Sequence, residues 1–156
     1  MELHFESIKV VAHVVDGTLI KGSTQDFHQD RAVFRIVLPN GMEAVPMEMA
    51  ELKAVFFVRD LTPASPRPRQ KEFSPNDGNR GNGRPVAAQF QDGELLLGYA
   101  LTYNPNRQGF FMLPPDPSDN NLRIFVVKRA VKTLKVGPAA LEFAHPANHP
   151  SEATAG

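Results

Sequence analysis

Cysteine is absent from the 156-residue sequence, so the chain has no thiolate nucleophile, no disulfide framework and no cysteine ligands for zinc or an iron–sulfur cluster. Net charge is also absent, because 17 basic residues balance 17 acidic ones. This removes the general attraction that a strongly basic protein has for nucleic acid or anionic membrane. No stretch is long and apolar enough to span a bilayer. The charged start at Glu2, Glu6 and Lys9 lacks the features of a secretory signal, so we expect a cytoplasmic protein.

Residue patterns that carry chemistry are also scarce. No serine, histidine and acid stand in a recognisable catalytic context, and no glycine loop is followed by a phosphate-binding basic residue. His145 and His149 have a spacing that suits a metal only on a helix, which Pro146 and Pro150 oppose. We therefore expect no enzyme activity, no cofactor and no metal site.

An internal repeat is the most informative feature of the chain. The segment from Asp16 to Gly22 recurs 76 residues later as Asp92 to Gly98. A loop with three inserted residues then changes the offset to 79. The further matching pairs are Phe27 with Tyr103, Arg31 with Arg107, Phe34 with Phe110, Val45 with Ile124, and Leu52 with Val131. A register held over this length indicates two copies of one module.

Each copy is predicted to form five short strands. Alternating apolar residues begin both copies, and Asp16-Gly17 and Asp92-Gly93 are typical hairpin turns, since glycine tolerates the positive φ that such turns need. Gly22 and its counterpart in the second copy are predicted to let the second strand bend sharply. A single helical turn precedes the last strand of each copy.

This strand pattern resembles the SH3-like and Sm-like small β-barrels, and the chain resembles an uncharacterised bacterial family that carries such modules in pairs. The fold class expected is therefore all-β, with two tandem five-stranded barrels. The predicted division is a first module over residues 8–58, a flexible Pro/Gly/Asn-rich basic linker over 59–84, a second module over 85–136, and a disordered tail over 137–156.

Aromatic residues predict an interface. Phe56, Phe57 and Phe125 supply more apolar surface than one face of a thin barrel needs, which indicates packing between the modules or against a second chain. The loop residues that repeat as an aromatic and an arginine are candidate interface anchors, or alternatively an aromatic end cap covered by the arginine stem. These residues are Phe27, Arg31, Tyr103 and Arg107.

One motif indicates a ligand. Arg80 and Arg84 form an R-x-x-x-R before the second module, and a loop with Asn104, Asn106 and Gly109 follows. This resembles the cyclic di-GMP signature of the PilZ family, in which arginines on a flexible segment wrap the nucleotide against a barrel. Asn106 departs from that pattern, because it stands where a small Ser or Ala is wanted.

Three functions follow from these observations. The first is a non-enzymatic interaction module that binds a protein partner or assembles with itself through strand edges or aromatic faces. The second is a PilZ-like sensor of cyclic di-GMP. The third is RNA binding of the Sm-like kind, which the neutral charge opposes.

Overall fold

The computed structural model describes residues 7–62, 72–73, 83–100 and 102–145. The strands of the first lobe are β1 (Ile8–Val14), β2 (Leu19–Thr24), β3 (Val33–Val37), β4 (Ala44–Glu48) and β5 (Leu52–Val58). Those of the second lobe are β6 (Arg84–Phe90), β7 (Leu95–Ala100), β8 (Gly109–Met112), β9 (Asn121–Val127) and β10 (Val131–Val136). Single 3₁₀ turns, η1 (Met49–Glu51) and η3 (Lys128–Ala130), precede β5 and β10, and a short helix, α1 (Pro138–Phe143), ends the described chain.

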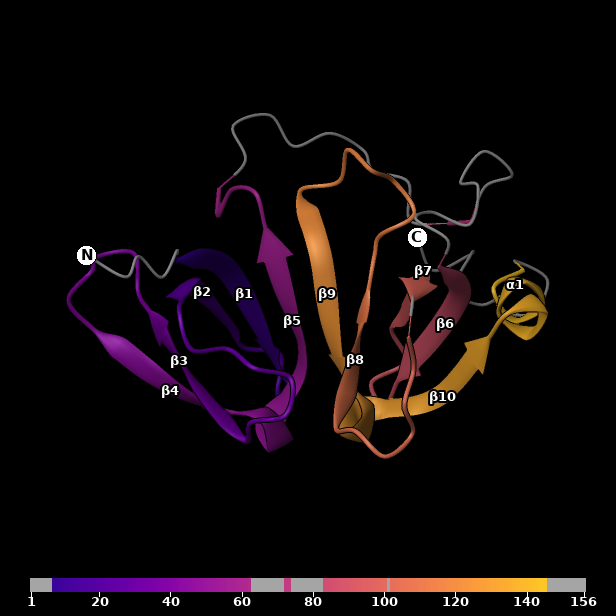
Figure 1. The fold of residues 1–156 in the computed structure, drawn as a ribbon, viewed down its shortest axis with the longest axis horizontal. Coiled ribbons are helices and arrows are strands. Elements are labelled where there is room, and N and C mark those ends of the chain that lie inside the picture. Colours follow the sequence, from indigo (N-terminus) through magenta and orange to yellow (C-terminus); the bar gives the residue numbers. More distant parts are fainter. Residues whose placement is uncertain (1–6, 63–71, 74–82, 101, 146–156) are drawn as a thin grey trace.

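The strands form two antiparallel sheets, which confirms the mainly β fold (Figure 1). One sheet has seven strands in the order β4-β3-β2-β1-β5-β9-β8, and the other has three in the order β10-β6-β7. An isolated bridge between Tyr99 and Leu113 links β7 to β8. The strand pairing does not confirm the two predicted tandem barrels, because the β5–β9 ladder joins the two lobes in one sheet.

The strand registers follow the sequence repeat. In the first lobe Val10 lies opposite Gly22, and in the second Val86 lies opposite Gly98. The later pairings repeat in the same way: Ala12–Val55 becomes Ala88–Leu134, and Phe34–Met47 becomes Phe110–Val126. The lobes therefore share one strand order.

The two central strands each serve both lobes. From β5, Val55 and Phe57 pack in the core of the first lobe, whereas the alternate residues Ala54 and Phe56 pack with the second. Strand β9 does the reverse, because its Phe125 and Val127 belong to the first core and Ile124 and Val126 to the second. Strands buried on both faces carry continuous apolar runs. The excess of aromatic residues is thus explained by an interface inside the chain.

Glycine at the bend of the second strand is required by close packing. A Cβ on Gly22 would lie 2.2 Å from the carbonyl oxygen of Val37, and a Cβ on Gly98 would lie 2.5 Å from that of Leu113. These distances leave no room for a side chain at either position, where β2 and β7 lie close to the main chain of the neighbouring segment.

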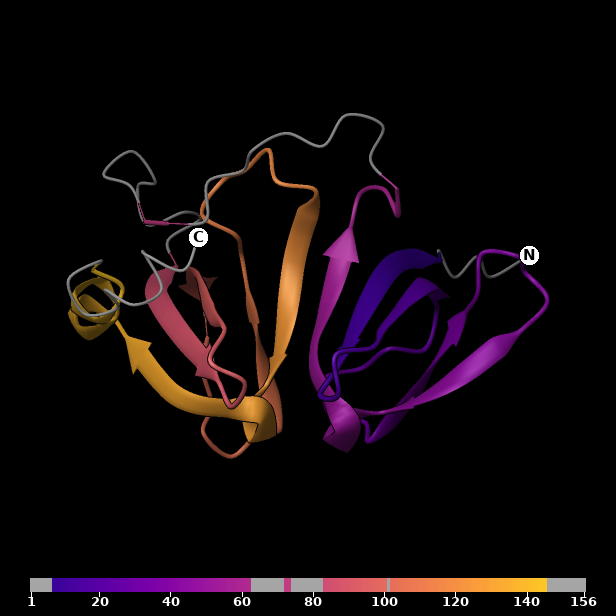
Figure 2. The same cartoon turned by 180° about the vertical axis from the view of Figure 1, so that it is seen from behind.

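Helix α1 lies within the segment predicted as a disordered tail. It begins after Gly137, whose φ is 74°, and Pro138 occupies its first turn, where proline is favoured. Its Ala140 is buried against Ala87 and Leu97 on the outer face of the second lobe (Figure 2). Burial of this small apolar face accounts for a helix that composition did not predict. Within the described residues, α1 and the other helical segments are too short to cross a bilayer.

Candidate functional site: the interlobe cleft

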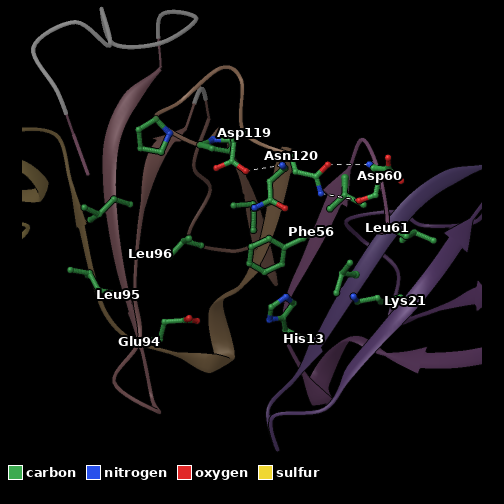
Figure 3. Close-up of a pocket in the computed structure, with 17 residues that line it drawn as sticks. His13, Lys21, Phe56, Asp60, Leu61, Glu94, Leu95, Leu96, Asp119 and Asn120 are labelled. Atoms are coloured by element: carbon green, nitrogen blue, oxygen red, sulfur yellow. Dashed lines mark hydrogen bonds between the residues drawn. The ribbon is translucent and has the colours of Figure 1, made fainter. Parts of the chain in front are cut away.

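A cleft of about 330 Å³ opens between the lobes (Figure 3). Its floor is one face of the seven-stranded sheet, with Val11, His13, Lys21, Phe56, Val58, Asn121 and Ile124. Its wall is β7, preceded by Glu94, and its far end is formed by the loops that carry Asp60, Leu61, Pro114, Pro115, Asp119 and Asn120. Among the described residues, the three-stranded sheet covers β5 and β9 but leaves part of β1 and β2 uncovered, and the cleft lies there.

The floor is mainly apolar. Val11 and Ile124 are buried at its base, and the rings of His13 and Phe56 lie 4.1 Å apart between them. Leu96 faces this floor from the wall, because it packs with Phe56 against the second core (Figure 3). A ligand with apolar groups therefore finds contacts on two sides.

The wall offers an open strand edge. Tyr99 exchanges two main-chain hydrogen bonds with Leu113, of 2.9 and 2.8 Å. Because main-chain groups alternate along a strand, those of Leu95 and Leu97 point to the same side as those of Tyr99. On that side they have no ladder partner within the described residues, and Pro115, which the register would place opposite Leu97, has no N–H to donate to the Leu97 carbonyl oxygen.

Lys53 fixes the hairpin end of this wall. Its Nζ donates to Asp92, at 2.8 Å, and to Glu94, and it lies 4.7 Å from the centre of the Phe90 ring. Burial alone would lower the pKa of Lys53, but the hydrogen bonds to the two carboxylates outweigh it and raise this pKa. The Lys53 hydrogen bond in turn lowers the pKa of Asp92. This bridge between β5 and the β6–β7 hairpin fixes the distance between the floor and the wall of the cleft.

The loops that carry the predicted anchor residues meet between the lobes, away from the cleft, but within the described part of the chain the anchor side chains do not pair with one another. Arg107 Nη1 contacts both carboxylate oxygens of Asp30 at 2.8 Å, and Gln108 Nε2 donates to the carbonyl oxygens of Gln29 and Arg31 at 2.7 Å. The two repeated loops therefore bind each other.

The two predicted aromatic anchors differ in position. Phe27 packs edge-on against Phe34, Phe57 and Phe125 in the first core. Tyr103 is 40% exposed and lies against Phe110.

The PilZ-like residues that the structure describes lie apart. Arg84 begins β6, next to the end of β10, where its side chain is the nearest neighbour of Gly137. Asn104 lies near the start of β10, at the opposite end of that strand from Arg84, because its carbonyl oxygen accepts from Lys128 in η3, which precedes β10. Asn106 donates its main-chain N–H to Asn104 Oδ1 within that loop, and Gly109 is required by packing, since a Cβ there would lie 2.3 Å from the Val126 carbonyl oxygen. Arg80 lies outside the described residues.

A second cavity, of about 530 Å³, lies where η1 and η3 approach each other. Two of its three cationic residues are already engaged, because Arg107 pairs with Asp30 and Lys128 donates to the carbonyl oxygens of Asn104 and Pro105. It is therefore a weaker candidate than the cleft. No cluster of His, Asp or Glu suited to a metal ion occurs among the residues that the structure describes.

The outermost strands are protected against pairing. Met49 donates its N–H to the Ala32 carbonyl oxygen, so by alternation the main chain of Pro46 faces away from β3. Proline at this position removes an exposed N–H donor from the edge of β4. On β10, Lys132 and Lys135 place charge along the edge strand. Each feature discourages edge-to-edge association.

Replacing Pro46 with valine is expected to strengthen self-association, because it restores an edge N–H and favours the strand. The mass of Pro46→Val and of the wild type is compared by sedimentation over a range of concentrations. Pro39→Val is the control, since Pro39 lies in the exposed β3–β4 turn. Equal masses for all three proteins would show that Pro46 does not prevent self-association through the edge of β4.

The sequence did not predict the cleft, although two signals point to it. The second copy has the run Leu95 to Leu97 where the first has Leu19, Ile20 and Lys21, and Pro114-Pro115 marks the place where pairing to the next strand stops. Neither signal states which surface of the first lobe lies opposite.

Comparison with protein-family models matches residues 6–137 to a family of unknown function (DUF6982). The matched region spans all ten strands and ends at Gly137, before α1. A search of curated proteins finds no match.

Proposed function

Since the chain belongs to this family of unknown function, we propose a function from the geometry of the cleft. It is a non-enzymatic interaction protein that binds an extended segment of a partner protein along the open edge of β7. The observation that carries this proposal is that the main-chain groups of Leu95 and Leu97, which have no ladder partner among the described residues, line a cleft whose floor is mainly apolar.

Strand addition satisfies both parts of the site. A segment paired with β7 becomes a fourth strand of the three-stranded sheet and covers the exposed face of β1 and β2. Main-chain hydrogen bonds to Leu95 and Leu97 supply sequence-independent affinity, while alternate side chains of the bound segment contact Val11 and Phe56 and supply specificity. The protected edges of β4 and β10 favour this mode over self-assembly through those strands.

Leu95→Pro tests the proposal directly. The substitution removes the Leu95 N–H, which points into the cleft, and leaves the ladder to β6 in place, because the neighbouring Leu96 and Leu97 stay paired with Ala88 and Ala87. Peptides are selected from a random displayed library on the immobilised full-length protein, and their Kd is then measured by titration. We expect binding to Leu95→Pro to be about tenfold weaker, as for the loss of one hydrogen bond with some steric hindrance.

The internal repeat provides the matched control. Leu19 is the equivalent residue of the first lobe, begins β2 in the same way, and lies outside the cleft. Leu19→Pro is expected to bind the selected peptides like the wild type. Equal binding to all three proteins, or no enrichment of peptides, would exclude strand addition at β7. Titration with cyclic di-GMP, repeated with Arg84→Ala, and with RNA at two salt concentrations measures the other two functions on the same protein.

A further inference from the structure

The acidic residues of the cleft lie at its two ends. Glu94 stands at the hairpin end of β7, and Asp60 follows the far end of β5 (Figure 3). Lys21 lies on β2, at the rim of the cleft, between the levels of Glu94 and Asp60. A bound segment therefore meets a carboxylate at each end and an apolar floor in the middle.

Glu94 carries negative charge that Lys53 does not fully neutralise. One ammonium group is shared by two carboxylates, because Lys53 Nζ contacts both Asp92 and Glu94. Lys53 is the buried partner, with a side chain 12% exposed, whereas the side chain of Glu94 is 58% exposed. A cation from a ligand can bind Glu94 from the solvent side while Asp92 still holds Lys53, so the hairpin stays fixed.

Asp60 is held in position through its main chain. Its N–H donates to Asn120 Oδ1 at 3.1 Å, and its carbonyl oxygen accepts from Asn120 Nδ2 at 2.9 Å. Within the described residues the Asp60 carboxylate itself has no hydrogen bond or ion pair. It is therefore available to a ligand, unlike Asp119, which accepts the N–H of Asn121 at 2.8 Å and is buried.

The separation of the two carboxylates sets the length of the segment. Glu94 contacts Lys53 near the start of β5, and Asp60 follows Val58 at its end. Asp60 lies two residues beyond the end of β5, after a bend at Arg59, so the seven residue steps from Lys53 to Asp60 span at most roughly 23 Å at the rise of a β-strand. A strand laid along the cleft needs at most about seven residues to reach from one carboxylate to the other.

We infer that the partner segment is basic at both ends and apolar at alternate positions between them, with the two basic residues about six or seven positions apart. Lys or Arg at one end pairs with Glu94, and a second basic residue pairs with Asp60. The inference rests on the proposed function, because it names the chemistry of the segment that β7 binds.

The selection described above tests the inference when the recovered peptides are sequenced. The expected enrichment is for Lys or Arg at this spacing. Synthetic peptides of that type are then titrated against Glu94→Gln and Asp60→Asn, each expected to weaken binding about two- to fivefold, as for a solvent-exposed ion pair. Lys21→Gln is the matched control that removes a charge of the opposite sign, and it is expected to bind these peptides as well as the wild type or better.

The outcomes separate the inference from the proposed function. Peptides that lose binding with Leu95→Pro but carry no basic residues, or bind Glu94→Gln and Asp60→Asn like the wild type, overturn the inference and leave strand addition standing. Enrichment of acidic peptides also overturns it. Peptides indifferent to Leu95→Pro overturn both.

Discussion

Replacing Phe125 with alanine is expected to lower the free energy of unfolding by about 3–5 kcal/mol, as for a fully buried phenylalanine that leaves a cavity. Phe125 is completely buried, and its ring packs edge-on against Phe27 at 5.3 Å and Phe111 at 5.1 Å. The residue belongs to the second lobe by sequence but fills the core of the first. The loss is therefore expected to appear in the unfolding of the whole chain.

The two tyrosines allow this to be measured. Both Tyr99 and Tyr103 lie in the second lobe, so tyrosine fluorescence reports that lobe alone, whereas far-ultraviolet circular dichroism reports the strands of both. In urea the two signals are expected to give one coincident transition, in the wild type and in Phe125→Ala.

Phe90→Ala is the control for this experiment, because Phe90 is equally buried but packs only in the second core. Phe90→Ala is expected to lower the free energy of unfolding by a similar amount. The fluorescence and circular dichroism transitions are again expected to shift together. Two separate transitions in the wild type would show that the lobes unfold independently and that the shared strands do not couple them.

The repeat made much of the fold predictable from sequence. Matching segments gave the number and order of strands, because hairpin turns at Gly17 and Gly93, with φ of 98° and 94°, leave little choice for the strands they join. The need for glycine at Gly22 and its counterpart was predictable for a similar reason, since a glycine inside a strand often marks close approach of another main chain.

The fusion of the lobes was only partly predictable. The aromatic excess around Phe56 and Phe125 indicated an interface, but sequence could not tell whether it lay within one chain. The stronger signal is a comparison between equivalent strands. Strand β9 is apolar from Ile124 to Val127, whereas the equivalent β4 has Pro46 and Glu48 at the positions of Phe125 and Val127. The two equivalent strands therefore differ in apolar content, because β9 has a neighbour on each side and β4 lies at the edge of the sheet.

The cleft depends on an overlap that no local pattern encodes. Its floor comes from the first lobe and its wall from the second, so it exists only because the β5–β9 ladder sets how far the smaller sheet extends over the larger one. The contact between Lys53 and Asp92 is of the same kind, since it joins residues 39 positions apart in sequence. Such contacts follow from tertiary packing, which propensity and spacing do not specify.

Replacing Gly22 with alanine is expected to destabilise the protein at or above the upper end of the range of about 1–3 kcal/mol typical of overpacking. The added Cβ would lie 2.2 Å from the Val37 carbonyl oxygen and 2.6 Å from Ile36 Cγ2. A side chain can rotate away from such a contact, but the carbonyl belongs to β3, whose pairing with β4 continues through Val37. Relief therefore requires separating β2 from β3, and the free energy of unfolding measured in urea falls accordingly.

Gly41→Ala distinguishes steric conflict from backbone strain. Gly41 has φ of 74° and no atom within 4 Å of a Cβ built on it, so alanine there meets only the cost of a left-handed conformation, about 1–2 kcal/mol. Gly22 has no such φ, and its expected loss comes from the contact alone. A loss for Gly22→Ala no larger than that for Gly41→Ala would mean that β2 and β3 separate easily at this point, and that their close approach contributes little to the stability of the first lobe.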